Sequence, residues 1–283
     1  MTTTPATATL PGRLDTSPWG LVAAAGVSVS AVLLFGLLQP LPGYLLLWGS
    51  VAAALLVSRY LARDLGLIAA GLTVVSQISL EADISNEGIL RFTIFLSLAV
   101  IVPFALERLV FRQKAIQFPL NTKRKWEPIE KAYLGGAVVL GWLLLPVYFL
   151  GSGSYRNWPE VTDPEYIGRL FFGVNAVGIW DELFFICTIF ALLLRHFPMW
   201  QANLLQSVIF VSFLWELGYR SWAPVFTIPF ALAQGYLFTR TRNLVYVVCV
   251  HLLFDLMVFL SIVHAYNPGL LPIFPTAIPF QRP

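Results

Sequence analysis

Residues 243–262 read NLVYVVCVHLLFDLMVFLSI, an apolar run long enough to cross a bilayer as a single helix. Its acidic and histidine side chains are His251 and Asp255. These two residues are four apart, so they share one face of the helix. Charged side chains are costly inside a membrane, and where they occur they face the bundle interior. The run therefore predicts a membrane span with a polar inner face.

The whole chain has the composition of a membrane protein. Of its 283 residues, 58% are hydrophobic and 12% are charged, whereas soluble domains carry about 25% charged residues. The mean hydropathy is +0.75. We predict an all-α, polytopic helix bundle that forms one membrane domain over residues 1–283. The net charge of +3 is too small to indicate nucleic-acid binding, so the expected surroundings are the lipid bilayer.

About nine spans are expected from the apolar runs, since a span needs roughly 20 apolar residues. They are 20–38, 41–58, 65–80, 89–106, 132–150, 167–195, 202–219, 222–238 and 243–262. The sixth is long, and Gly178 marks a possible break in it. Glycine and proline between the runs indicate turns.

The distribution of Lys and Arg predicts the orientation. With residues 1–19 as a cytoplasmic tail, residues 107–131 form a basic cytoplasmic loop. Five of the 18 Lys and Arg residues are then left on the outer side: Arg91, Arg156, Arg169, Arg220 and Arg282. The chain is therefore expected to be a multi-pass protein of the plasma membrane with a cytoplasmic N-terminus. The run Lys123–Lys125 is interpreted as part of this orienting signal.

Acidic residues near mid-membrane depth are the candidates for a functional site. Glu182, Glu216 and Asp255 lie 13, 14 and 12 residues from the cytoplasmic ends of their predicted spans. At 1.5 Å per residue, their depths differ by only a few Å. His251 lies about one turn below. Asp181 is adjacent to Glu182, and neighbours on a helix point about 100° apart, so we expect one of the two to face the site squarely.

Polar neighbours suggest which helix faces turn inward. Asn175 lies seven residues before Glu182, and Ser212 lies four before Glu216. Thr227 and Gln234 are seven apart on the next span. The pattern predicts a small polar cavity within the bundle. The other two histidines, His196 and His264, stand at span ends and are expected at the membrane interface.

The chemistry of such a cluster is limited by charge. Four carboxylates cannot all remain ionised in a low dielectric, so they share protons or bind a cation. A carboxylate beside a histidine suits general-base activation of water. Alternatively, a divalent metal such as zinc, held by Glu182, Glu216, His251 and Asp255, would activate the water. The structural alternative is that these residues make polar contacts only.

The second half of the chain resembles the CAAX protease and bacteriocin-processing (CPBP) family, also called the CAAX-protease/ABI family. The family signature is EExxxR on one helix, FxxxH on the next, and HxxxN or HxxxD two helices later. Here Asp181-Glu182 is followed, in the same helix order, by His251-Leu-Leu-Phe-Asp255. The resemblance covers residues 165–262. It implies a CPBP-like catalytic core in which Asp181, Glu182, Glu216, His251 and Asp255 are the catalytic positions.

The motifs depart from the family pattern in two places. Ile186 stands at the arginine position of the first motif. In the second motif, Glu216 takes the histidine position if Leu-Trp-Glu-Leu is aligned with Leu-Trp-His-Leu. If Phe210 is aligned instead, Leu214 takes that position. We expect the first alignment, with Glu216 beside His251, because it places a polar group at the right depth. Were Glu216 to point away, an inactive member would become the better interpretation.

The resemblance implies an intramembrane endopeptidase that cleaves a membrane-tethered peptide or protein with carboxylate- or metal-activated water. The alternatives are a catalytically inactive member of the family, a proton- or cation-linked transporter, and a membrane scaffold. In the family, the glutamate of the first motif activates the water together with the histidine of the second motif. The resemblance therefore implies Asp181 or Glu182 as the base, with Glu216 as its partner. The third motif stabilises the oxyanion or binds a metal.

Overall fold

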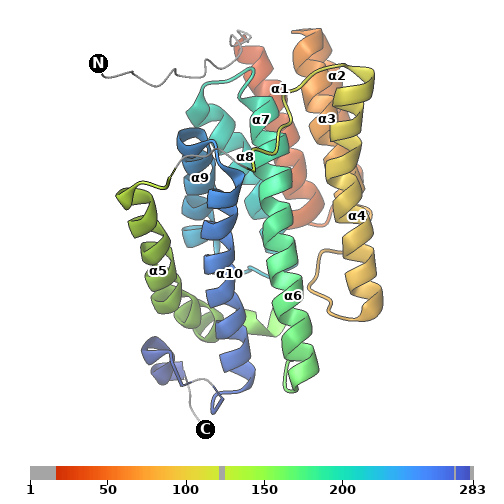
Figure 1. Cartoon of the computed structure of the whole chain (residues 1–283). Coiled ribbons are helices and arrows are strands. Elements are labelled where there is room, and N and C mark those ends of the chain that lie inside the picture. Colours follow the sequence, from red (N-terminus) through yellow and green to blue (C-terminus); the bar gives the residue numbers. More distant parts are fainter. Residues whose placement is uncertain (1–16, 121–124, 271, 281–283) are drawn as a thin grey trace, which may run out of the picture.

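The described residues fold entirely into helices and their connections. The computed structural model describes residues 17–120, 125–270 and 272–280. Within these ranges nine helical rods stand side by side, and no strand is present (Figure 1). Most of the expected tail 1–19, and residues 121–124 of the expected basic loop, lie outside the described ranges. The all-α prediction is confirmed.

The nine rods coincide with the nine expected spans. They are α1 (Pro18–Ala31) with η1 (Val32–Gly36), α2 (Pro40–Leu55), α3 (Arg59–Val75), α4 (Asn86–Ala105) with η2 (Leu106–Val110), α5 (Pro128–Ser152), α6 (Pro164–Asp181) with η4 (Glu182–Phe190) and α7 (Ala191–Leu193), α8 (Met199–Leu217), α9 (Pro224–Thr241) and α10 (Leu244–Tyr266). Two 3-10 turns follow α5 and α10: η3 (Ser154–Asn157) and η5 (Pro275–Phe280).

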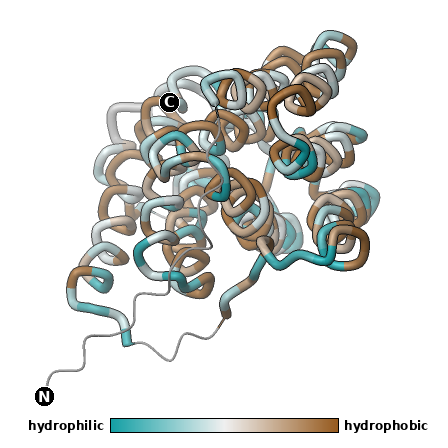
Figure 2. Tube along the Cα trace, turned by 90° about the horizontal axis from the view of Figure 1, so that it is seen from above, coloured by the Kyte–Doolittle hydropathy of each residue, from teal (hydrophilic) through white to brown (hydrophobic). Residues whose placement is uncertain are grey.

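Five of these rods are long and apolar enough to cross a membrane, namely those that begin at residues 18, 86, 128, 164 and 244. Large hydrophobic side chains such as Leu90 and Leu140 are exposed on the outside of the bundle. Hydrophobic residues occur at its periphery as well as at its centre (Figure 2). A soluble protein rarely exposes so much apolar surface, so the bundle suits a lipid environment.

Local sequence explains where the rods begin and end. Proline stands in the first turn of α1, α2, α5, α6 and α9, where its missing N–H costs nothing. The Asp163 carboxylate accepts the backbone N–H groups of residues 165 and 166 and caps α6. Several boundaries differ from the sequence expectation, and the largest difference is at the start of α3. Helix α3 begins at Arg59, six residues before the expected span, because Ser58 caps it by accepting the Tyr60 N–H.

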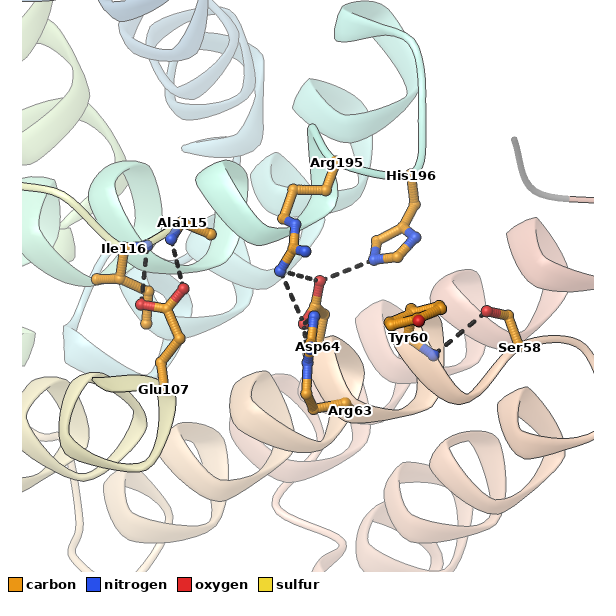
Figure 3. A network of polar contacts seen from close by, with 9 residues as sticks. All are labelled: Ser58, Tyr60, Arg63, Asp64, Glu107, Ala115, Ile116, Arg195 and His196. Carbon is orange, nitrogen blue, oxygen red and sulfur yellow. Dashed lines mark hydrogen bonds and ion pairs between the residues drawn. The ribbon is translucent and has the colours of Figure 1, made fainter. Parts of the chain in front are cut away.

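One end of the bundle, here called the basic end, holds the connections 56–58, 111–127, 194–198 and 242–243. At this end the buried Asp64 of α3 is bound by three cationic or potentially cationic side chains (Figure 3). Arg63 lies 2.8 Å away, Arg195 2.9 Å and His196 2.8 Å. The contacts join α3 to the segment that follows α7. Nearby, the Glu107 carboxylate accepts backbone N–H groups of residues 115 and 116 and holds the connection after α4 in place.

The interface positions expected for His196 and His264 are wrong, since both side chains are buried. His196 is drawn in by Asp64, a partner on a helix far away in sequence. His264 packs edge-on against Phe274 from the segment after α10, with ring centroids 5.4 Å apart. Position along a span therefore did not decide their exposure.

Replacing Asp64 with alanine is expected to destabilise the protein by about 3–5 kcal/mol, because buried cationic groups lose their counterion. Thermal unfolding in detergent would measure this. The control is Glu165→Ala, which removes the partly exposed Arg169–Glu165 pair and is expected to cost less than about 1 kcal/mol. Equal unfolding temperatures for the two variants would contradict a structural role for Asp64.

Candidate active site

The acidic pair lies where the sixth rod changes from α-helix to π-helix. Helix α6 ends at Asp181, and the wider π-helical segment η4 begins at Glu182. Such π-helical segments are rare in proteins, and those that occur are often found at functional sites. Both carboxyl side chains are buried and both contact His251 of α10. The expectation that one of the two would face the site is therefore wrong, since they reach opposite edges of the imidazole ring.

His251 is surrounded by three carboxyl groups. Its Nδ1 lies 2.7 Å from Glu182 Oε1. Its Nε2 lies 3.6 Å from Asp181 Oδ2 and 3.8 Å from Asp255 Oδ2. The two aspartate distances exceed hydrogen-bond length, so the short Glu182–His251 contact orients the ring and the aspartates flank its other nitrogen.

A glutamine from α9 completes the carboxylate–histidine pair. Gln234 Nε2 donates to the same Glu182 Oε1 at 2.6 Å and to the Val247 carbonyl at 3.2 Å. The inward face expected for Gln234 is confirmed. Glu182 is thus held from two helices, which restricts its rotation and that of His251.

The close approach of α6 to α10 depends on Gly178. A Cβ atom at this position would lie 2.0 Å from Asp255 Oδ2 and 3.3 Å from His251 Cδ2. Without a side chain there, the Asp255 carboxylate can sit directly over the backbone of α6. Gly178 does not break the sixth rod, which runs through this point as continuous helix.

A cavity of about 300 Å³ opens beside this cluster. Asp181, His251 and Asp255 contribute to its wall, whereas most of the remaining wall is apolar. Other residues that line the cavity include Asp83, Thr93, Ser97, Trp158, Phe172, Phe210, Leu214, Tyr219, Thr227 and Phe230. Asp181 Oδ1 and Asp255 Oδ2 are buried and form no hydrogen bond among the described residues. Two acceptors of the cluster are therefore buried without a donor in the described part of the chain.

Two aromatic rings pack on the imidazole. The Phe230 ring of α9 lies 5.0 Å from His251, edge to face, and the Phe210 ring of α8 lies 6.1 Å from it. They keep this side of the ring apolar. Phe230 was not singled out from the sequence, because an isolated phenylalanine in a membrane span carries no distinguishing signal. Phe210 was named only in the second alignment of the FxxxH motif.

Glu216 is not brought into the cluster. It is buried in the last turn of α8, where its Oε1 accepts the backbone N–H of Leu80 at 3.0 Å. Leu80 belongs to the connection 76–85, at the end of the bundle opposite the basic end. The residues of α8 that line the cavity are instead Phe210, Leu214 and Leu217. This geometry favours the second alignment, in which Leu214 occupies the histidine position.

Two further polar residues also differ from expectation. Asn175 donates to the Phe171 carbonyl of its own helix, and Ser212 donates to Val208 in the same way. Neither lines the cavity. Thr227 does line it, while its hydroxyl donates to the Ala223 carbonyl. The spacing of polar residues along the sequence therefore identified the inner face of α9 but not that of α6 or α8.

Of the four residues expected to hold a divalent metal, Glu182, His251 and Asp255 lie in one cluster, whereas Glu216 lies outside it. Among the described residues, no three His, Cys, Asp or Glu side chains are grouped so as to hold one ion. Glu216 is bound to the connection 76–85, and Glu182 Oε1 already faces two nitrogen atoms. The side chains as they lie do not fit a metal centre, so the chemistry below is described for these side chains alone.

The helices that carry the cluster resemble a known protein family. Residues 163–257 match the family described as type II CAAX prenyl endopeptidase Rce1-like. Residues 163–257 form a Rce1-like domain. This domain contains α6, η4, α7, α8, α9 and α10 up to residue 257, and so includes every candidate site residue. Comparisons with curated proteins and with solved structures found no match. The CPBP resemblance expected from the sequence is confirmed for this segment.

Replacing Glu216 with glutamine tests its place outside the reactive cluster of the Rce1-like domain. The carboxamide oxygen can still accept the Leu80 N–H, so any peptide hydrolysis by the Rce1-like domain is expected to stay within about threefold of the wild type, as for a retained neutral hydrogen bond. The rate of cleavage of a membrane-tethered peptide is the measurement. A loss of 100-fold or more with an intact fold would return Glu216 to the catalytic set.

Proposed function

We propose that the protein is an intramembrane endopeptidase that hydrolyses a peptide bond of a membrane-tethered peptide or protein. The observation that carries the proposal is the Glu182–His251 pair, which lies beside Asp181 and Asp255 at the wall of a largely apolar cavity. A carboxylate that orients a histidine is a common device for general-base catalysis. In this domain the pair is complete without a histidine from the second motif.

The proposed reaction uses His251 as the proton carrier. When Nδ1–H donates to Glu182, Nε2 has a free lone pair on the side of Asp181 and Asp255. A water molecule held there loses a proton to Nε2 as its oxygen attacks the peptide carbonyl carbon. The C–N bond then breaks, and the proton passes from Nε2 to the leaving nitrogen. Glu182 stabilises the imidazolium that forms between the two transfers.

Access from the side of the bundle supports a membrane-tethered substrate. Thr93 and Ser97 of α4 and Phe172 of α6 line the cavity and are also exposed at the outer surface. An apolar chain in the bilayer could reach the cavity between these helices without crossing water. The name of the matched family suggests a prenylated peptide that ends in a CAAX box as the first substrate to try.

The test uses purified protein in lipid nanodiscs with a farnesylated CAAX peptide. Mass spectrometry is expected to show release of the C-terminal tripeptide. The proposal would be rejected if the folded protein cleaved neither this peptide nor any of a panel of other membrane-tethered peptides.

A second candidate function is the catalytically inactive member of the family, which the sequence favoured for the case that Glu216 lies away from His251, as it does. Such a protein binds the peptide but does not cleave it. Leu214 favours it, because this residue occupies the histidine position of the second motif and cannot move a proton. Binding of the farnesylated peptide without tripeptide release would select this candidate. Tripeptide release that depends on His251 would exclude it.

We also propose that the protein lies in the plasma membrane with its basic end facing the cytoplasm. Cysteines would be placed at the exposed Gln117 and Glu160 in a chain whose Cys187 and Cys249 are alanine. In intact cells, a membrane-impermeant thiol reagent is expected to label position 160 and not 117. Labelling of position 117, or of both positions, would contradict this orientation.

A further inference from the structure

The cavity beside the reactive cluster extends toward one end of the bundle only. Five helices line it, and each connects the basic end to the opposite end, here called the far end, which is the lower one in Figure 1. Measured from the basic end, the lining starts at Ser97 on α4, Asp181 on α6, Phe210 on α8, Phe230 on α9 and His251 on α10. On all five helices, therefore, the cavity occupies the part that leads from the cluster to the far end.

The side of the cluster toward the basic end is closed by packed side chains. Residues 199–209 of α8 and 244–250 of α10 separate it from the basic end, a layer about 10–16 Å thick at 1.5 Å per residue. Phe190 and Tyr246 in this layer are fully buried. The void that borders the cluster on this side measures about 10 Å³, room for at most one water molecule. A peptide therefore has no path to His251 from the basic end.

On the other side, the cavity opens to the surface between α4 and α6. Thr93, Phe172 and Ala176 line the cavity and are exposed on the outside of the bundle. At 1.5 Å per residue, Thr93 and Phe172 lie about 10–12 Å from the far-end starts of their helices. The hydrocarbon of one leaflet is about 15 Å thick, half of the bilayer core. The opening therefore faces the leaflet at the far end.

Two hydrogen-bonded bridges between α4 and α6 frame this opening. On its basic-end side, the Trp180 indole N–H donates to the Leu96 carbonyl at 2.7 Å. On its far-end side, Arg169 Nη1 donates to Asn86 Oδ1 at 2.7 Å. The helices are thus held together above and below the opening. The bridge at Trp180 also separates the opening from the half of the bilayer at the basic end.

The same cavity reaches the polar surface at the far end. Ala82, Asp83 and Ile84 of the connection 76–85 line it and are half-buried, and the Asp83 side chain is 36% exposed. The cavity therefore meets hydrocarbon between α4 and α6 and polar surroundings at the connection. A peptide held in a membrane by an apolar anchor needs both, because its anchor stays in lipid while its polar backbone stays near water.

We infer that the substrate is a peptide anchored in the leaflet at the far end of the bundle, and that it reaches His251 from that side alone, between α4 and α6. The inference rests on the proposed function, because it names the substrate class of the same site. With the basic end toward the cytoplasm, as proposed above, this leaflet is the outer one. The substrate class is then an exported peptide that keeps an apolar anchor, rather than a protein anchored on the cytoplasmic face.

The test uses vesicles in which the protein has one known orientation. The chain whose Cys187 and Cys249 are alanine carries Gln117→Cys or Glu160→Cys, and it is reconstituted at a dilution that leaves most occupied vesicles with a single molecule. An impermeant biotin maleimide marks the vesicles whose cysteine faces outward, and streptavidin captures them. The probe is the farnesylated CAAX peptide with a lysine-rich N-terminal tail, which keeps it in the outer leaflet to which it is added.

Vesicles captured through Glu160→Cys present the far end and are expected to release the tripeptide. Those captured through Gln117→Cys are expected to release it at least about 100-fold more slowly, because the charged tail crosses the bilayer slowly. When the peptide is included during reconstitution, so that both leaflets contain it, both populations should cleave it, which establishes that both are active. Equal or faster release by the Gln117→Cys population from peptide added outside would overturn the inference.

Thr93→Trp tests the route between α4 and α6, and Ile94→Trp is its matched control. Both positions are exposed on α4, but only Thr93 lines the cavity. The indole at position 93 is expected to lower tripeptide release at least about tenfold by excluding the peptide, whereas the control should cleave normally. Unfolding temperatures establish that both variants are folded. Normal cleavage by a folded Thr93→Trp protein would also overturn the inference.

A photoreactive version of the peptide, with a benzophenone beside the scissile bond, separates this outcome from that of the proposed function. Crosslinking to the Glu160→Cys population alone, in a protein that releases no tripeptide, supports the far-end route and rejects the peptidase. Tripeptide release by the Gln117→Cys population from peptide added outside supports the peptidase and rejects the route. Neither crosslinking nor release in either population rejects both.

Discussion

His251→Ala and Glu182→Gln are each expected to lower the rate constant of peptide hydrolysis by about 10²–10⁴-fold, the contribution typical of a positioned general base. The two residues act through one contact, the 2.7 Å hydrogen bond between Nδ1 and Oε1. Once either residue is replaced, the remaining one contributes little to the rate of hydrolysis. The double variant is therefore expected to hydrolyse the peptide no more slowly than the slower of the two single variants, as for other catalytic groups that act as a unit.

The measurements are single-turnover cleavage in nanodiscs and thermal unfolding of the same samples. Removing a buried carboxylate from a bundle that packs through apolar contacts should leave it folded. Glu165→Gln, at an exposed position on α6, is the control and should cleave normally. Additive losses in the double variant would mean that Glu182 and His251 act separately. Full activity of either single variant would remove that residue from the mechanism.

Gly178→Ala is expected to reduce hydrolysis by at least about 100-fold, although it adds one methyl group and changes no polar atom. The methyl carbon would lie 2.0 Å from Asp255 Oδ2, so either the carboxylate must leave its position or α10 must move away from α6. A misplacement of about 1 Å at a catalytic site can cost 100-fold in rate. Overpacking of this kind also destabilises a protein by about 1–3 kcal/mol.

Gly173→Ala is the matched control on the same helix, because a Cβ there meets nothing within 4 Å. It also lines the cavity, so it tests whether any added methyl group at this wall is harmful. The comparison is made by cleavage rate and unfolding temperature. Similar activity of the Gly178 and Gly173 variants would show that the close contact of α6 with Asp255 is not required.

Much of the bundle could be predicted from the chain because membrane helices follow simple rules. Apolar runs of span length become rods wherever backbone groups must find partners within the helix. Helical spacing placed His251 and Asp255 on one face, and counting along the spans placed Asp181 and Glu182 at their depth. The family resemblance rested on the same residues, and the comparison confirms it for residues 163–257.

Depth along a helix is a linear quantity, and so counting residues along the spans placed Asp181, Glu182 and Asp255 near one level. Direction around the helix axis depends on packing, and only the tertiary structure decided it. The same counting expected Glu216 at that level, yet it lies in the last turn of α8, where it accepts the Leu80 N–H, and α8 presents Leu214 to the cavity. The π-helical segment η4 begins at Glu182, beside His251, and no sequence pattern predicted it. Trp158 and Tyr219 line the cavity from connections, where no periodic pattern assigns a direction to a side chain.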